Sequence, residues 1–500
     1  MRDSLILYVN GRRHEVRGRD AFGPLSSWLR YTLGLTGTKV VCAEGDCGSC
    51  AVLIGRVVDG TIRYRPVTSC IQYLYQLDAT HIVTVEGLTP GEPDTPDGLN
   101  PVQEAMVACH GAQCGFCTPG FVVSMSALLE ENRRPSETEV RRALVGNLCR
   151  CTGYAPILDA ARAIDAGRFQ SVHERYADPT LLADLRAAAE SPVCITAGER
   201  RFCKPVTLAD AIAWRGENPG CTIIAGGTDL GVTMNKGRAD PQAILSTVGL
   251  AELRTIHVAD GRMEVGAGAT LAEWQAACRG VLPAAEAMLE RHGSPLIRNA
   301  GTLAGNIVNG SPIGDSMPLL FVLDAEVELA GPTATRRVRL DQFYTGYRQS
   351  VLQPDELLTR VIIPLPPTDA IVRFCKVSRR EDLDISTFAA GIRIELDGDT
   401  IRTARVALGG VAATIQRMVL VERFLEGRPF TLETFLEAGE MAARQVRPIS
   451  DVRGAAAYRT RLAANVLVRF YMEASGAAVP PVDGDGRFAP VSVNGKQRAN

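Results

Sequence analysis

The fold is decided by the stretch Cys42-Ala-Glu-Gly-Asp-Cys47-Gly-Ser-Cys50, which Cys70 follows after 19 further residues. This C-x4-C-x2-C spacing with one distant cysteine is that of a plant-type [2Fe–2S] site, in which four thiolates hold two irons. Gly45 and Gly48 let the backbone wrap closely and leave N–H groups free to bond to sulfur. A structural zinc ion and cysteines without metal are the alternatives, although zinc sites more typically pair two short knuckles.

The residues around this stretch predict a small α+β domain over residues 1–88. Residues 4–10 alternate and end in Asn10-Gly11, a strong hairpin signal, and a second strand continues to Val16. Apolar residues at helical spacing over 25–33 predict a helix. Residues 51–54 and 81–85 are apolar runs of strand length.

A second cysteine set follows in a segment with helical patterns, which predicts a helical bundle over residues 89–170. Residues 89–100 are rich in proline and glycine, and helices are expected from Pro101, over 119–132, from the capping box at Ser136, and over 155–166. The pairs Cys114-Gly-Phe-Cys117 and Cys149-Arg-Cys151 fall at the helix junctions. Spacing alone leaves zinc open here, but the tight C-x-C pair suits thiolates on two irons better.

Beyond a connector over 171–193, short strands alternate with helices and predict an α+β domain over 194–367. Its strand 222–225 enters Gly226-Gly227-Thr228-Asp229, and a second glycine-rich loop spans 298–306. Without a Cβ in the way, such amides can point together at a pyrophosphate, and an ordinary strand-to-helix loop is the alternative. No G-x-G-x-x-G follows a strand as a Rossmann site requires.

The last part of the chain predicts one more α+β domain over 368–478. Strand-like runs over 388–396 and 401–408 flank a turn at Gly398, and amphipathic helices follow to about residue 475. Residues 479–500 are polar and rich in glycine and proline, which indicates a flexible tail.

Composition limits the function classes. The chain has 500 residues, 46% of them hydrophobic, with 54 basic and 56 acidic side chains and a net charge of −2. This describes a globular protein of roughly three domains and offers no electrostatic case for nucleic-acid binding. No apolar run has the length of a membrane span, and the N-terminus has no secretory signal pattern. With 14 cysteines, mostly clustered, we expect a cytoplasmic protein that binds metal through thiolates.

Several longer strings resemble one family, the molybdenum hydroxylases. The stretch 42–50 is similar to its ferredoxin loop, and His110–Gly120 and Gly146–Tyr154 are similar to its second, helical cluster domain. Ile224–Leu230 and Ile297–Asn306 resemble its FAD domain, and Lys376–Ser386 resembles a loop near its flavin. Both clusters and FAD on one chain without a molybdenum domain resemble the small subunit of bacterial xanthine dehydrogenase.

The resemblance implies roles for individual residues. One [2Fe–2S] cluster is expected on Cys42, Cys47, Cys50 and Cys70, and the other on Cys114, Cys117, Cys149 and Cys151. FAD is expected on Ile223, Ile224, Ala225, Gly226, Gly227, Thr228, Asp229, Leu230, Thr302, Leu303, Ala304, Gly305 and Asn306, with Asp315, Leu358 and Lys376 completing the site. His292 stands where relatives often place an aromatic residue on the flavin. Gln113 and Cys151 are expected nearest to the partner's pterin.

The resemblance also implies a function. The chain would be the electron-transfer subunit of a molybdopterin hydroxylase, with a molybdopterin-binding large subunit as partner, in a dimer of heterodimers. Electrons from xanthine or hypoxanthine would pass through the helical-domain cluster, the ferredoxin-like cluster and FAD to NAD, and this chain would carry no catalytic residue for the substrate. Another N-heterocycle, an aldehyde or an aromatic thioester are alternative substrates. A protein that binds zinc and a nucleotide, without enzymatic activity, is the alternative from another class.

Overall fold

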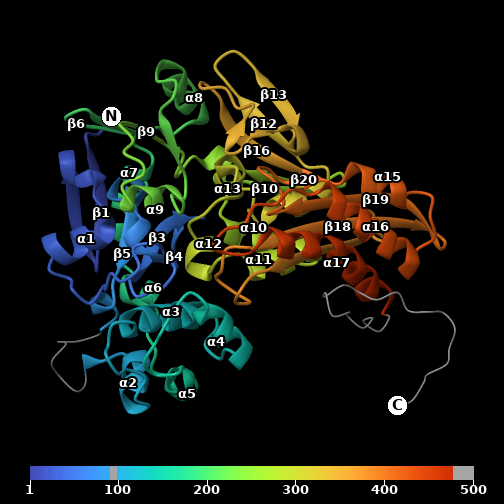
Figure 1. The fold of residues 1–500 in the computed structure, drawn as a ribbon. Helices are drawn as coiled ribbons and strands as arrows, with labels where there is room; N and C mark the ends of the chain where they lie inside the picture. The colour runs from blue at the N-terminus through green and yellow to red at the C-terminus, as the bar shows by residue number, and fades with distance from the viewer. Residues whose placement is uncertain (90–97, 477–500) are drawn as a thin grey trace.

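The computed structural model describes residues 1–89 and 98–476. The expected linker residues 90–97 and the expected tail 479–500 lie outside these ranges. Figure 1 shows the N-terminal elements and the helices after them at one end of the molecule, and the C-terminal sheet and helices at the other. The family's expected multidomain α+β architecture is confirmed. None of the described helices combines the length and apolarity needed to cross a membrane.

The N-terminal module, residues 1–89, is a five-stranded sheet in the order β2-β1-β5-β3-β4. Asn10 and Gly11 adopt φ of 49° and 79°, the left-handed pair that a two-residue hairpin needs, so the predicted hairpin is confirmed. The helix predicted over 25–33 is present, as three α-helical residues that pass into a π-helical turn. The elements are β1 (Ser4–Val9), β2 (Arg12–Arg17), α1 (Leu25–Ser27), the π-turn Trp28–Thr32, β3 (Ala51–Val58), β4 (Thr61–Thr68) and β5 (Thr80–Val83).

The helical module, residues 98–170, has the four predicted helices. The Ser136 side chain caps the third of them, as its capping box predicts. Both cysteine pairs lie in the loops between helices. The helices are α2 (Pro101–Ala108), α3 (Thr118–Glu131), α4 (Glu137–Leu144) and α5 (Ala155–Ala163), and the connector adds α6 (Val172–Arg175) and α7 (Pro179–Ala189).

The central module, residues 193–366, has two larger sheets, in the orders β6-β7-β9-β8 and β10-β11-β16-β12-β13. Its strands are β6 (Val193–Ala197), β7 (Arg200–Lys204), β8 (Thr222–Ile224), β9 (Ala243–Ser246), β10 (Ile256–Ala259), β11 (Arg262–Gly266), β12 (Glu326–Ala330), β13 (Thr335–Arg339), β14 (Tyr344–Gly346), β15 (Gln349–Ser350) and β16 (Leu357–Pro364). Its helices are α8 (Leu208–Glu217), α9 (Leu230–Asn235), α10 (Leu271–Cys278), α11 (Pro283–Glu290), α12 (Pro295–Arg298), α13 (Leu303–Asn309) and α14 (Ser316–Val322).

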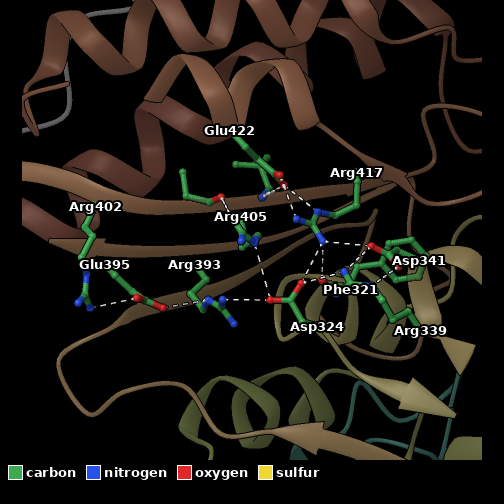
Figure 2. A network of polar contacts seen from close by, with 12 residues as sticks. Phe321, Asp324, Arg339, Asp341, Arg393, Glu395, Arg402, Arg405, Arg417 and Glu422 are labelled. Atoms are coloured by element: carbon green, nitrogen blue, oxygen red, sulfur yellow. Dashed lines mark hydrogen bonds and ion pairs between the residues drawn. The ribbon is translucent and has the colours of Figure 1, made fainter. Parts of the chain in front are cut away.

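The C-terminal module, residues 371–476, packs three helices on a sheet in the order β17-β18-β19-β20. Its elements are β17 (Ile371–Val377), β18 (Phe388–Asp397), β19 (Thr400–Gly409), β20 (Gln416–Arg417), α15 (Val419–Leu425), α16 (Leu432–Gln445) and α17 (Ala456–Ser475). Figure 2 shows how this module is tied to the central one. Asp324, just after α14, lies within 4 Å of the guanidinium groups of Arg393, Arg405 and Arg417.

The N-terminal and central modules share one core, which the sequence did not indicate. Leu5 and Leu7 of β1 belong to the same buried cluster as Phe202 and Ile244 of the central module. A buried ion pair between Asp78 and Lys204 (2.7 Å) joins the same two modules. The cysteines outside the two sets are scattered in the sequence, but Cys194 and Cys203 face each other across β6 and β7 and form a disulfide.

Candidate functional site

The first cysteine group, Cys42, Cys47, Cys50 and Cys70, comes together in space. The Cys42 thiol lies close enough to those of Cys47 and Cys70 for them to influence one another, and the same holds for Cys50 and Cys70. These contacts lower the pKa of Cys42 and Cys50 and raise the pKa of Cys47 and Cys70. Cys50 and Cys70 are each 2% exposed. The four predicted thiols therefore form one mostly buried set that water reaches only at its edge.

The loop that carries this group needs its glycines. Gly45 and Gly48 have φ of 83° and 68°, in the left-handed region that glycine enters at no steric cost. The Asn235 amide, at the end of α9, donates to the carbonyls of Ala43 and Cys70, both at 2.9 Å. One side chain of the central module thus holds both the loop and the distant cysteine in place.

The second cysteine group, Cys114, Cys117, Cys149 and Cys151, forms two contacting pairs. The thiols of Cys117 and Cys149 lie close together, and so do those of Cys114 and Cys151. Burial raises the pKa of Cys117 to about 12. Burial also acts to raise the pKa of Cys149, but the hydroxyl and N–H of Thr152, at 3.1 and 3.4 Å from its sulfur, outweigh it and lower that pKa. Cys114 and Cys151 are exposed.

Both groups have the donor set that a [2Fe–2S] cluster needs. In the described residues, no three His, Cys, Asp or Glu side chains converge closely enough to surround a single metal ion. A [2Fe–2S] cluster needs only two protein thiolates around each metal ion, because its four thiolates are divided between two irons. Each group has four neighbouring thiols with a backbone or hydroxyl donor near a sulfur, which fits this requirement.

The two cysteine groups are in direct backbone contact. The Leu148 N–H, next to Cys149, donates to the Cys47 carbonyl at 3.0 Å. A Cβ on Gly48 would lie 2.3 Å from the Gly146 carbonyl oxygen, which only a glycine avoids without movement. The loops of the two groups, about 100 residues apart in sequence, therefore pack without an intervening side chain.

A cavity of about 300 Å³ lies between the two glycine-rich loops of the central module. We call it the glycine-loop cavity. Most of the residues that we assigned to FAD line it, from both loops and from β16. They are Ile223, Ile224, Ala225, Gly226, Gly227, Thr228, Asp229, Leu230, His292, Thr302, Ala304, Gly305, Asn306 and Leu358.

The glycines of the two loops are needed for packing, in addition to the predicted close approach of the backbone to a pyrophosphate. A Cβ on Gly226 would lie 1.9 Å from the Ala300 carbonyl oxygen, and one on Gly227, whose φ is +68°, would lie 2.5 Å from the Gln76 amide nitrogen. Glycine is thus required for the two loops and the N-terminal module to pack. A wall of backbone with a 300 Å³ hollow fits an extended nucleotide cofactor, since it places N–H groups at the surface.

Three of the predicted FAD residues do not line the cavity: Leu303, Asp315 and Lys376. Leu303 is buried in the first turn of α13. Asp315 and Lys376 form a buried ion pair of 2.8 Å, and Asp315 also lies 3.3 Å from Nδ1 of His292, which does line the cavity. Lys376 is therefore not a free cation at the cavity, because the Asp315 carboxylate pairs with it.

The Asp315 carboxylate stays charged in this network. Burial acts to raise its pKa, but the nearby His292 ring and the charge of Lys376 outweigh burial and leave the pKa below its ordinary value. Ser386 also donates to its second oxygen at 2.5 Å. Asp315 and Lys376 act on the cavity through His292 and by joining the central and C-terminal modules.

Ile297 links the first cysteine group to the glycine-loop cavity, and the sequence analysis had not singled it out. It lines the cavity and packs on the cluster of Cys50, Cys70 and Ile71. Its position in the string 297–306 was the available signal, but nothing in the string indicated a contact with a cysteine loop 250 residues away.

Comparisons with known proteins agree with this geometry. Residues 84–162 match the [2Fe-2S] binding domain, residues 197–366 the FAD binding domain in molybdopterin dehydrogenase, and residues 373–474 the CO dehydrogenase flavoprotein C-terminal domain. The first match contains the whole second cysteine group, which favours an iron–sulfur cluster over zinc in that group. The second contains both glycine-rich loops.

Full-length relatives and solved structures extend the likeness. The chain is 30% identical to xanthine dehydrogenase 1 of Arabidopsis thaliana over 541 residues, covering 93% of this chain and 39% of that protein. It is 30% identical to a chain of Cu,Mo-CO dehydrogenase (TM-score 0.52, covering 54% of this chain and 94% of that one). It is 26% identical to a chain of quinoline 2-oxidoreductase from Pseudomonas putida 86 (TM-score 0.52, covering 55% and 96%).

The fold and the sites define a multidomain iron–sulfur flavoprotein of the oxidoreductase class. The chain belongs to the molybdenum hydroxylase family. It spans about two fifths of the length of the curated xanthine dehydrogenases that it matches.

Proposed function

We propose that this chain is the electron-transfer subunit of a molybdenum hydroxylase and carries two [2Fe–2S] clusters and one FAD. One observation carries the proposal: the two cysteine groups and the glycine-loop cavity are contiguous. Leu148 and Cys47 join the two groups through a hydrogen bond, and Ile297 joins the first group to the cavity. The order is second group, first group, cavity.

When bound, the clusters supply one-electron and FAD two-electron redox chemistry. The residues of the chain hold and separate these groups. The N–H of Glu44 and the hydroxyl of Thr152 bond to cysteine sulfur, which favours the charged thiolates. Burial of Cys50 and Cys70 keeps water from the first group, and the backbone of both glycine-rich loops cradles the cofactor.

The partner is proposed to be a molybdopterin-binding large subunit, in a dimer of heterodimers. Its docking surface would be the outer end of the helical module. There Gln113, Cys114 and Cys151 are exposed, and Phe116 leaves 54% of its surface open to solvent. An exposed ligand set beside an exposed aromatic ring supports a contact that a second chain completes.

For the substrate we propose xanthine or hypoxanthine, with NAD as electron acceptor. Xanthine dehydrogenases among the relatives support this choice, whereas the quinoline 2-oxidoreductase supports another N-heterocycle as the second candidate. An aldehyde or aromatic thioester is a further candidate of the same kind. The pocket that would decide belongs to the proposed partner. We also propose a cytoplasmic location and retain domain limits at 1–88, 89–170, 171–193, 194–367, 368–478 and 479–500.

Cofactor analysis of the purified chain tests the core of the proposal. We expect about four irons and four acid-labile sulfides, since each cluster holds two of each, and one FAD. Stoichiometric zinc in place of iron contradicts it.

Mixing with NADH tests the acceptor. Prompt bleaching of flavin absorbance supports NAD, whereas an unchanged spectrum points to oxygen or a protein. Oxidation of hypoxanthine by the isolated chain would contradict the division of labour with a partner.

A further inference from the structure

A second cavity, of about 360 Å³, lies between the N-terminal and central modules. One wall is the outer face of the hairpin β3–β4, and the other is the start of α10 with the loops beside it. Asn299 closes one side by donating to the Pro66 carbonyl at 2.9 Å. We call it the arginine cavity, because four arginines line it: Arg56, Arg63, Arg65 and Arg254.

The charged residues that line this cavity are predominantly basic. Glu273 is the only acidic residue among those that line it, against four arginines. Arg56 and Arg63 are directly opposite each other in the β3–β4 register, an arrangement in which like charges destabilise a sheet. Three of the arginines have carboxylate partners, namely Asp59 for Arg63, Glu131 for Arg65 and Glu273 for Arg254.

Arg56 is the exception. Within the ranges that the structure describes, no carboxylate lies within ion-pair distance of its guanidinium, whose recorded hydrogen bond is to the Gln76 carbonyl at 2.9 Å. Burial and the neighbouring charge of Arg254 lower the pKa of Arg56 to about 10. A partly buried guanidinium with spare donors, facing other cations, is stabilised by an anion placed between them.

We propose that the arginine cavity binds a small phosphate-bearing anion. Arginine forks match phosphate oxygens in pairs, and the Arg56 guanidinium, with no ion-pair partner among the described residues, offers such a fork beside three further arginines. The volume lies in the range of small-molecule sites, about 300–1,000 Å³. The anion would bridge the module of the first cysteine group and the module of the glycine-loop cavity.

This phosphate chemistry has two possible sources. Ala225, Gly226, Thr247 and Thr302 line both cavities, so the diphosphate of FAD is one source and a free anion is the other. We infer a free anion, because the four arginines lie on the far side of the Gly226 loop and none of them lines the glycine-loop cavity.

Calorimetric titration of the full chain with its cofactors tests the proposal, with inorganic pyrophosphate as the probe and sodium chloride at equal ionic strength as the blank. We expect saturable binding at one site and a weakening of about tenfold or more in Arg56→Gln, as for loss of a charge-assisted bond. The control is Arg17→Gln on β2, an exposed arginine paired with Asp3 and Glu15, which should bind as the wild type does. Absence of saturable binding, or equal weakening in both variants, overturns the proposal.

The same variants separate the two sources. FAD content of Arg56→Gln should equal that of the wild type, and loss of FAD together with pyrophosphate binding would assign the cavity to the flavin and overturn the free-anion site. If Arg56→Gln does not fold, wild-type crystals soaked in tungstate decide. An anomalous peak within hydrogen-bond reach of Arg56 supports the site, and its absence rejects it. Neither readout depends on electron transfer, so the proposed function is tested separately.

Discussion

Each cysteine group has four thiols, but the first group is enclosed by protein and the second lies at the surface. The first is enclosed by the central module, with Asn235 bonded to two carbonyls of its loops and Ile297 packed on Cys50 and Cys70. The second is held within a small helical module and leaves Cys114 and Cys151 open to solvent. Two sets of four cysteines therefore have different neighbours. The first set lies against the flavin-binding module, and the second lies at the solvent-exposed surface.

The position of each group in the fold, and not its ligand set, therefore decides which neighbours it has. The enclosed group has neighbours on both sides, Leu148 on one and Ile297 on the other. The exposed group has a neighbour on one side only. A group with one open side is suited to exchange electrons with another chain, which is the role that we propose for it.

The largest effect is expected from removing one ligand of each group. Cys47→Ser should abolish the EPR signal of one reduced cluster and Cys117→Ser that of the other, because the groups are held by separate modules. Cys109→Ser, a helix C-cap cysteine outside both groups, is the matched control and should keep both signals. If one substitution removed both signals from folded protein, the two groups would not be independent sites.

The next largest effect is expected at the buried ion pair of Lys376 and Asp315, which joins the central and C-terminal modules. Lys376→Met should cost about 3–5 kcal/mol of unfolding free energy, because it leaves a buried carboxylate without its cation. Urea unfolding at neutral pH measures this loss.

The pH dependence of the same variant gives the control. The pKa of Asp315 is lowered in the folded chain, so its stabilisation is present above the ordinary Asp pKa of about 3.9 and is lost as pH falls through the lowered pKa. The stability difference between wild type and Lys376→Met should therefore shrink in acid. A difference that does not change with pH would mean that packing, and not charge, explains the loss.

A smaller effect should follow from forcing the two groups apart. Gly48→Ala and Gly115→Ala both place a Cβ on left-handed backbone, at about 1–2 kcal/mol. A Cβ at Gly115 meets nothing within 4 Å, whereas one at Gly48 meets the Gly146 carbonyl, so only Gly48→Ala should lose about 1–3 kcal/mol more. Reduction of the flavin through the clusters should also slow in this variant alone. Equal behaviour of the two variants would show that the contact between the groups has no role.

The smallest effect on stability is expected at the exposed surface beside the second cysteine group. Phe116→Ala should change the unfolding free energy by no more than about 0.5 kcal/mol, as for other exposed positions, and yet reduce co-purification of the partner subunit. Unchanged co-purification would move the docking surface away from the second group.

The sequence predicted those features that depend on interactions between neighbouring residues. The Asn10-Gly11 turn and the Ser136 cap both act within a few residues, and the hairpin and the helix start follow them. The strand β4 was missed, although Asp59-Gly60 is a turn signal of the same kind. Thirteen of the FAD positions came from strings 223–230 and 302–306, and they line one cavity except for Leu303.

The sequence by itself determined the glycine-rich loops and the family, and it led to the proposed ligand sets and module limits, because each rests on residue types in recognisable strings. The tertiary structure alone decided that Asp78 and Lys204 join two modules, that Asp315 neutralises Lys376, and that Ile297 lies between thiols and cavity. These contacts join residues tens to hundreds of positions apart. No pattern of local propensity encodes such a contact, since it forms only when separately folded elements pack and bury the same surface.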